Sequence, residues 1–353
     1  MITYPFRFCV NNIKRMFNIP SEPFLLNYSV TFRCNLDCKY CGVSRLKNNY
    51  SQEELSRREI SIFLDDKKLR YLDVVVVTGG EPFLKDDLAE IILEFKKKSP
   101  VKIFHITTNG FLTERIVDSM RFFRSKGLKI DLKISIDDIG DRHDALRGKA
   151  GSFQKAVLTL SSLRKIMKKN DIFIGINQTI YEENSKSIPE VKKLAHEFDV
   201  SYLGFIGLKM RPLYSSSGEC DYALTDLSEE SRDIARDELS NNYPGKIKLN
   251  NFSDCLEKII IQHYTKGQLD LLYNKHKRHR CMNLFSHFRL NPNGDILTCS
   301  YDTEVLGNIK KESYSRILKK EFTKEKLNKV KGCGRCWLGC EVTPSWVSSL
   351  CLA

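Results

Sequence analysis

The sequence predicts a parallel α/β fold: an open partial barrel of six β/α units, (β/α)6, followed by a small cysteine-rich α+β module. Two observations predict this fold class. Short β-rich runs alternate with amphipathic helical runs through the middle of the chain, as expected when each helix leads to the next parallel strand. Polar motifs follow the strands at equivalent positions, and catalytic groups collect at the carboxyl ends of strands in such barrels.

The barrel is expected to occupy residues 25–211. Its strands are predicted over residues 25–31, 74–78, 103–107, 131–136, 172–180 and 202–208. Its helices are predicted over residues 51–64, 86–98, 113–125, 152–168 and 187–197. The first of these helices begins with Ser51, and Glu54 follows three residues later, which is typical of a capping box.

Three further segments complete the chain. Residues 1–24 contain a short basic helix with Phe6, Val10, Ile13 and Phe17 on one face. Such a helix can lie on an anionic membrane surface, but we expect the commoner outcome, that it caps the bottom of the barrel. Residues 212–280 connect the barrel to the module through helical runs at 226–239 and 252–263 and are expected to cover the barrel mouth. Residues 281–353 form the cysteine-rich module.

The sequence does not indicate a membrane-spanning protein or a secreted protein. The 353 residues contain no apolar run long enough to span a membrane and no secretory signal. Twelve cysteines in such a chain indicate metal binding rather than disulfides, in a reducing, low-oxygen cytoplasm. The net charge of +13 favours anionic partners. Because the lysines are widely spread, most of the charge is expected on a solvated surface, and no nucleic acid partner is expected.

Cys34, Cys38 and Cys41 follow the first predicted strand with the spacing C-x3-C-x2-C, and no fourth cysteine is near. Three thiolates can hold three irons of a [4Fe–4S] cube and leave the fourth iron open, whereas a structural cluster usually has four cysteines. An open iron can chelate the amino and carboxylate groups of S-adenosylmethionine (SAM), and an electron passed through the cluster can then release a 5′-deoxyadenosyl radical. A zinc site would require a fourth ligand.

This cysteine loop resembles that of the radical SAM enzyme superfamily, and so does the segment Gly79-Gly80-Glu81-Pro82 after the second strand. Glycines there allow a backbone to approach a ligand closely. The resemblance implies roles in SAM binding for six residues. Tyr40 would lie near the adenine, Gly79, Gly80 and Glu81 would bind the methionyl amino group, and Ser135 and Asp137 would face the methionyl carboxylate or the ribose.

Other polar residues at the strand ends leave two interpretations open. Residues 143–153 resemble the segment after the fourth strand in peptide-modifying members of the superfamily. There Arg147 would pair with the methionyl carboxylate, which suits its planar fork, or it would form an ordinary salt bridge. Asn177 and Thr179 would either contact the cofactor or line the barrel with internal hydrogen bonds. For Asn109, a turn with Gly110 is the stronger expectation.

The C-terminal cysteines predict a second metal site. A turn at residues 291–295 is expected to form a hairpin that brings Cys281 and Cys299 together. A helical run at 314–331 then leads to Cys333, Cys336 and Cys340. The pattern resembles the SPASM/twitch extension, although its second half departs from the full SPASM pattern, and it implies one auxiliary [4Fe–4S] cluster. The expected ligands are Cys281, Cys299, Cys333 and Cys336, with Cys340 competing for either of the last two places.

A structural zinc remains the alternative for this module. Cys9, Cys220 and Cys255 fit no ligand spacing and are expected to be buried, inert thiols. For Cys220, near the expected mouth of the site, the alternative is a thiol that donates a hydrogen atom.

The resemblance covers residues 25–340 and implies an enzyme that abstracts hydrogen from a substrate carbon. The first expectation for the substrate is a peptide or protein, and the alternative is a membrane lipid or a cell-envelope sugar intermediate. A remote alternative is a non-catalytic iron–sulfur or zinc protein. The implied electron donor is a protein such as ferredoxin or flavodoxin. Cytoplasmic localisation is expected. The basic N-terminal helix suggests an alternative, in which the protein also contacts an anionic inner membrane surface peripherally.

Overall fold

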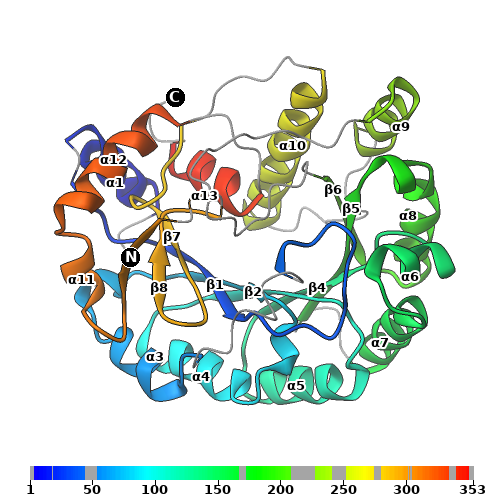
Figure 1. The fold of residues 1–353 in the computed structure, drawn as a ribbon, viewed down its shortest axis with the longest axis horizontal. Coiled ribbons are helices and arrows are strands. Elements are labelled where there is room, and N and C mark those ends of the chain that lie inside the picture. Colours follow the sequence, from blue (N-terminus) through cyan, green and yellow to red (C-terminus); the bar gives the residue numbers. More distant parts are fainter. Residues whose placement is uncertain are drawn as a thin grey trace.

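A nine-stranded sheet organises the protein, in the strand order β6-β5-β4-β3-β2-β1-β7-β8-β9. The structure is a computed structural model that describes residues 4–17, 19–43, 54–166, 172–207, 227–240, 252–273, 280–300, 302, 304–333 and 339–349. Helices lie along the outer face of the curved sheet, and the strands beyond β1, which are β7, β8 and β9, come from the C-terminal part of the chain (Figure 1).

The predicted partial barrel is confirmed. Its strands are β1 (Leu25–Thr31), β2 (Val74–Gly79), β3 (Ile103–Thr108), β4 (Ile130–Ser135), β5 (Ile172–Ile180) and β6 (Ser201–Ile206). Each pairs in parallel with the next. The helices are α3 (Arg57–Phe63), α4 (Leu88–Lys98), α5 (Thr113–Ser125), α6 (Asp141–Arg147), α7 (Ser152–Ile166) and α8 (Ile188–Glu197), with short 3₁₀ turns η1 (Lys67–Leu69), η2 (Pro82–Leu84) and η3 (Glu182–Ser187).

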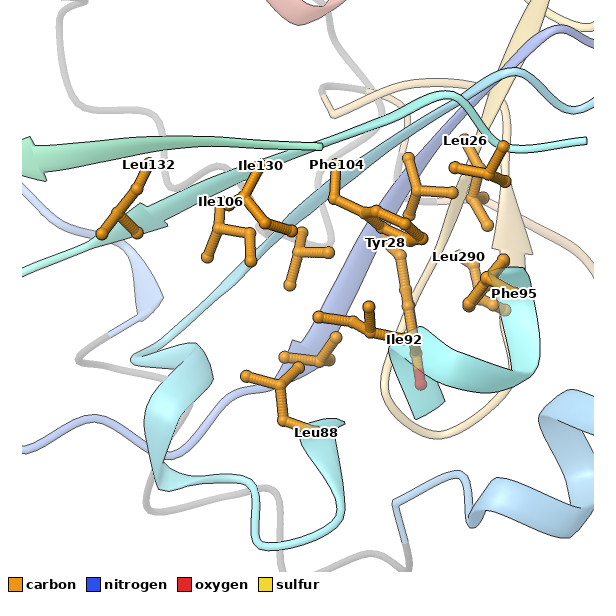
Figure 2. Packing of buried hydrophobic residues seen from close by; sticks show 14 of the residues in the cluster. Leu26, Tyr28, Leu88, Ile92, Phe95, Phe104, Ile106, Ile130, Leu132 and Leu290 are labelled. Carbon is orange, nitrogen blue, oxygen red and sulfur yellow. The ribbon is translucent and has the colours of Figure 1, made fainter. Parts of the chain in front are cut away.

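The core lies between the sheet and its helices, because successive side chains of a strand point to opposite faces. Leu26 and Tyr28 of β1 lie close to Phe104 of β3 and to Ile92 and Phe95 of α4 (Figure 2). All five are buried. The opposite face of the same strands is therefore free to carry polar side chains into the barrel interior.

The capping box predicted at Ser51 and Glu54 is wrong. Helix α3 begins after Ser56, whose side chain accepts from the Glu59 amide, while Glu59 accepts from the Ser56 amide at 2.8 Å. Two Ser-x-x-Glu patterns follow each other closely, at residues 51–54 and 56–59, and local pattern alone does not decide between them. Ser51 lies outside the described residues, and Glu54 serves another purpose, described below.

The C-terminal hairpin extends the barrel sheet instead of forming a separate layer. Strand β7 (His287–Leu290) runs parallel to β1, and β8 (Asp295–Leu297) and β9 (Val305–Asn308) follow in antiparallel pairs. The predicted helix at 314–331 is two helices, α11 (Tyr314–Ile317) and α12 (Glu321–Gly332). An additional helix, α13 (Gly339–Ser349), packs against β7.

The N-terminal helix packs against the C-terminal helix, and its role as a cap of the barrel bottom stays a prediction. Helix α1 (Tyr4–Met16) packs against α13, and Asn12 Nδ2 donates to the Ser348 carbonyl at 2.5 Å. Lys14 pairs with Glu22 at 2.5 Å. Ile13, Met16 and Phe17 remain more than half exposed.

Two helices described in the connecting segment are α9 (Glu229–Ser240) and α10 (Phe252–Leu272), which pack against each other. Helix α10 continues well past its predicted end at residue 263. In the part of the chain that the structure describes, no helix combines the length and apolar character needed to cross a membrane.

Candidate SAM and iron–sulfur sites

The loop that carries Cys34, Cys38 and Cys41 is fixed on one side to the end of β2. The Gly80 amide donates to the Thr31 carbonyl at 2.7 Å, and the Glu81 amide donates to the Arg33 carbonyl at 2.9 Å. A Cβ atom on Gly80 would stand 2.1 Å from the Arg33 carbonyl oxygen. A glycine is therefore required at position 80 because two stretches of backbone approach each other closely there. The sequence alone did not reveal this reason.

The same loop is fixed on its other side to the end of α6. The Asp37 amide donates to the Arg147 carbonyl at 3.2 Å, and the Lys39 amide donates to the Leu146 carbonyl at 2.9 Å. Gly148 ends α6 with φ 65°, and a Cβ there would stand 2.2 Å from the Asp37 carbonyl oxygen. The cysteines are thus held between a strand end and a helix end.

Glu54 strengthens the base of this loop, although the sequence assigned it to a helix cap. Its carboxylate accepts from the Thr31 hydroxyl at the end of β1 and lies 3.4 Å from both Arg33 Nη2 and Lys85 Nζ. It therefore connects the first strand to the segment that follows β2.

Glu81 is buried, and its carboxylate is engaged within the protein. It accepts from Thr108 Oγ1 at 2.8 Å, from the Asn109 amide at 2.8 Å and from the Phe83 amide at 3.2 Å. Burial raises the pKa of Glu81 to about 7, against the lowering by these hydrogen bonds. We therefore assign its side chain to holding the β2 and β3 ends together, and leave ligand contact to the neighbouring backbone.

Arg147 and Asp137 form a buried ion pair beside the cysteines. Arg147 Nη2 lies 2.8 Å from Asp137 Oδ2, and the two side chains are 12% and 10% exposed. Arg147 Nη1 lies 3.9 Å from Cys38 Sγ, and Asp137 Oδ1 accepts from the Thr179 amide at 2.9 Å. The ion pair of Arg147 is thus buried and not a surface salt bridge. One side of the guanidinium binds Asp137, so only its other nitrogens remain available to a ligand.

His143 braces the same strand end and was not singled out by the sequence. Its Nδ1 accepts from the Asp137 amide at 3.1 Å, and burial, together with the charge of Arg147, lowers its pKa to about 3. The ring is therefore neutral at physiological pH. The neighbouring Asp144 accepts from Gly151, Ser152 and Phe153 at the start of α7, which gives the motif at residues 143–153 a structural role beside that of Arg147.

Asn109 and Asn35 are site residues that the sequence analysis understated. Asn109 Oδ1 accepts from the Phe111 amide at 2.9 Å, which confirms the turn. Its Nδ2 also donates to Asn35 Oδ1 at 2.8 Å and lies 4.0 Å from Cys34 Sγ. The only signal for this second role was the position of Asn109 directly after a strand.

Tyr40, Ser135 and Asn177 lie at the same end of the barrel. The Tyr40 ring stacks on Tyr181 with 3.8 Å between the ring centroids. Ser135 and Asn177 are register partners on β4 and β5, so their side chains lie on one face. The predicted cofactor-binding residues are therefore brought to the strand ends around the cysteine loop, while direct contact with SAM remains a prediction for each.

The donor set and its surroundings fit a cluster and SAM. Near the cysteine loop, the buried atoms Asn35 Nδ2, Arg147 Nε and Asn177 Oδ1 have no hydrogen-bond partner among the described residues. Since buried polar groups are normally satisfied, these suit a ligand that carries carboxylate, ammonium and hydroxyl groups. Among the described residues, no three His, Cys, Asp or Glu side chains converge on a single metal ion. A four-iron cube does not demand that, because each of its irons takes its own ligand.

The C-terminal cysteines assemble a second thiol cluster. A hydrogen bond with Cys333, then burial, raises the pKa of Cys281 well above its ordinary value, and the charge of nearby Cys299 adds to the effect. Asn283 Nδ2 lies 3.5 Å from Cys281 Sγ, and the Asp302 amide lies 3.4 Å from Cys299 Sγ. Three predicted ligands are thus adjacent, with N–H donors directed at two of the sulfurs, and such donors tune the reduction potential of iron–sulfur clusters.

The remaining cysteines are only partly described. Cys336 and Cys220 lie outside the described residues, while Cys340 in α13 and Cys255 in α10 have side chains that are not described. The choice between Cys336 and Cys340 as ligand therefore stays a prediction. Cys9 is half-buried and forms no disulfide.

A buried polar network that the sequence analysis missed joins this second cluster to the barrel. Glu341 Oε2 lies 3.1 Å from His287 Nε2, and Glu341 Oε1 accepts from the Ser300 amide, next to Cys299, at 3.0 Å. Burial opposes the charge of Glu341, but the hydrogen bond and charge of His287 lower its pKa to about 2. Arg289 links Ser300 to Ser29 of β1, at 2.8 and 2.5 Å.

Comparison with known families agrees with these two sites. Residues 28–194 match the family model of the radical SAM superfamily, and residues 281–337 match SPASM, described as an iron–sulfur cluster-binding domain. The two matches together cover well over half of the 353 residues. The chain therefore belongs to the radical SAM superfamily and carries a SPASM domain. Its cofactors are SAM, a [4Fe–4S] cluster and an auxiliary iron–sulfur cluster. Structural zinc is therefore not needed to explain the C-terminal cysteines.

Individual relatives are more distant. Pre-heme d1 synthase of Dinoroseobacter shibae is 29% identical over 201 residues, 56% of this chain and 47% of that protein. The subtilosin biosynthesis protein AlbA of Bacillus subtilis is 28% identical over 173 residues, 48% of this chain and 36% of that protein. The chain spans about half the length of the first curated relatives that it matches.

A solved structure shows the same fold. SuiB of Streptococcus suis, bound to SAM, superposes with a TM-score of 0.58 at 15% identity, over 90% of this chain and 70% of that chain. This likeness supports the architecture of a barrel followed by a cysteine-rich region.

Proposed function

We propose that the protein is a radical SAM enzyme that abstracts a hydrogen atom from a peptide or protein substrate. The observation that carries the catalytic part is the cysteine loop fixed between β2 and α6, with unpartnered polar atoms of Asn35, Arg147 and Asn177 around it. When bound, the cluster and SAM would supply a 5′-deoxyadenosyl radical and methionine on taking one electron from a donor such as ferredoxin or flavodoxin, and hydrogen abstraction would yield 5′-deoxyadenosine.

The chain's own residues orient and shield this chemistry. The ion pair of Arg147 with Asp137 holds a cation next to Cys38. Asn109 holds the loop through Asn35. The Tyr40–Tyr181 stack provides an aromatic surface on which an adenine could pack.

The substrate class is supported by similarity to AlbA, whose name places it in the biosynthesis of the bacteriocin subtilosin. A tetrapyrrole is the second candidate, because the first three relatives are named as synthases of pre-heme d1, Fe-coproporphyrin III and heme. The lipid or envelope-sugar alternative drew on the basic N-terminal helix and on the net charge of +13. In the structure Lys14 and Arg15 of that helix make internal contacts, so the helix no longer supports this alternative.

The test is anaerobic turnover of the reconstituted protein with SAM and a reductant, with 5′-deoxyadenosine as the readout. Separate reactions receive a peptide fraction, a porphyrin fraction and lipid vesicles from the host. The proposal expects stimulation by the peptide fraction. Stimulation by porphyrins alone would move the assignment to tetrapyrrole chemistry, and stimulation by vesicles alone would restore the lipid alternative.

The matched control compares two cysteine variants. Cys38→Ala should abolish SAM cleavage, whereas Cys9→Ala, which lies on α1 away from the loop, should leave it unchanged. A folded Cys38→Ala protein that still cleaves SAM would overturn the cluster assignment. Absence of cleavage in the cluster-loaded wild-type protein would favour the non-catalytic alternative.

A further inference from the structure

The N-terminal helix makes its most specific contacts with the segments that carry the auxiliary-cluster cysteines. Arg15 Nε donates to the carbonyl of Cys281 itself at 3.0 Å. Its Nη2 donates at 3.0 Å to the carbonyl of Lys331, two residues before Cys333. One guanidinium thus bridges the segments that carry Cys281 and Cys333, which lie far apart in the sequence.

Further bonds from the same helix hold this arrangement. Lys331 Nζ donates back to the Met16 carbonyl at 2.8 Å, so the ends of α1 and α12 are joined in both directions. Arg280, the residue before Cys281, donates to Asn12 Oδ1 at 3.3 Å, while Asn12 Nδ2 bonds to Ser348 in α13. The helix therefore contacts all three segments on which Cys281, Cys333 and Cys340 are carried.

We propose that Arg15 is a positioning residue for the auxiliary cluster: its fork fixes the spacing of the Cys281 and Cys333 segments, and its positive charge raises the reduction potential of the cluster. The proposal rests on the assignment of Cys281 and Cys333 as cluster ligands. It explains the basic helix at residues 4–16 without a membrane.

The physical basis is the control of metal sites by groups beyond the ligands. Such partners fix ligand geometry, and their removal typically costs about 10–100-fold in metal affinity. The potential of an iron–sulfur cluster depends on net charge, hydrogen bonding and exposure. A fixed cation favours the reduced form, which carries the extra negative charge.

The test uses the full-length chain with Cys34, Cys38 and Cys41 all changed to alanine, so that only the auxiliary cluster binds. Arg15→Gln removes the charge and the fork, whereas Arg15→Lys keeps the charge and loses the fork. Two quantities are measured: the rate of cluster loss to an iron chelator and the reduction potential from an EPR-monitored titration. The matched control is Arg58→Gln, which removes one charge from an exposed site on α3.

The expected result separates the two roles. Both Arg15 variants should lose the cluster about tenfold faster or more, and only Arg15→Gln should shift the potential to more negative values. Arg58→Gln should resemble the parent in both measurements. The shift in potential is the readout that a merely structural clamp would not produce.

Parent-like behaviour of both Arg15 variants would overturn the inference. Faster loss with an unchanged potential in Arg15→Gln would overturn its electrostatic part. A parent that holds no auxiliary iron would overturn the ligand assignment and the inference together, while SAM cleavage by the wild-type protein, measured separately, would leave the proposed function standing.

Discussion

The buried pair of Arg147 and Asp137 allows a quantitative prediction. The Nη2–Oδ2 distance is 2.8 Å and both side chains are largely buried. Removing one member of such a pair leaves an uncompensated charge in a medium that solvates it poorly, which costs about 3–5 kcal/mol. Arg147→Met should therefore reduce the free energy of unfolding by about that amount, because among the described residues the Asp137 carboxylate would keep only the Thr179 amide as a partner.

The double variant Arg147→Met/Asp137→Asn should cost much less than the two single variants added together. No buried charge remains in it, and the coupling energy of the cycle should reach about 2 kcal/mol or more. The measurement is urea unfolding of the cluster-free protein, so that loss of a cluster does not mix with unfolding.

An exposed pair with the same geometry provides the control. Arg115 Nη2 lies 2.8 Å from Asp86 Oδ1, but its side chains are 41% and 84% exposed. A double-mutant cycle on this pair should show negligible coupling. The reasoning would be refuted if the Arg147 variant were as stable as the Arg115 variant, or if the costs at Arg147 and Asp137 were simply additive.

Three further predictions follow from single contacts. Gly80→Ala should lower the free energy of unfolding by about 1–3 kcal/mol, because the new methyl group overpacks against the Arg33 carbonyl, and it should lower the iron content of the first cluster. The control is Gly127→Ala, where φ is 63° and the space around the residue is open. It should cost about 1 kcal/mol and leave the iron content unchanged. The pKa of Glu81 is raised to about 7 from 4.5, so its contribution to stability is greatest below pH 4.5 and is lost as pH rises to 7. Relative to Glu81→Gln, wild-type unfolding energy should fall by about 3 kcal/mol over that range; a pH-independent difference would contradict this. Tyr314→Phe should stabilise the protein by about 1 kcal/mol, since the buried hydroxyl has no hydrogen-bond partner among the residues that the structure describes. Tyr202→Phe, which loses a 2.5 Å bond to Gln178, should destabilise it, and equal effects in urea unfolding would count against the assignment.

Local patterns were sufficient for the barrel elements. Strands β1 and β5 and helix α5 begin and end where hydrophobic periodicity predicts, because the pattern of buried side chains repeats within a few residues of sequence. The cysteine spacings needed no more than local sequence either. They place ligands on one loop, and the family comparison confirms the class of cofactor that they predicted.

Contacts between distant segments could not be read in this way. The sequence by itself determined the six β/α units, the cysteine loop and the C-terminal hairpin. Only the tertiary structure decided that β7 pairs with β1, that Glu54 supports the cysteine loop, and that Arg15 reaches the Cys281 segment. Periodicity fixes which face of an element is buried, but the partner of that face depends on packing and hydrogen bonds between different elements, separated here by 23 to 266 residues, which no local pattern encodes.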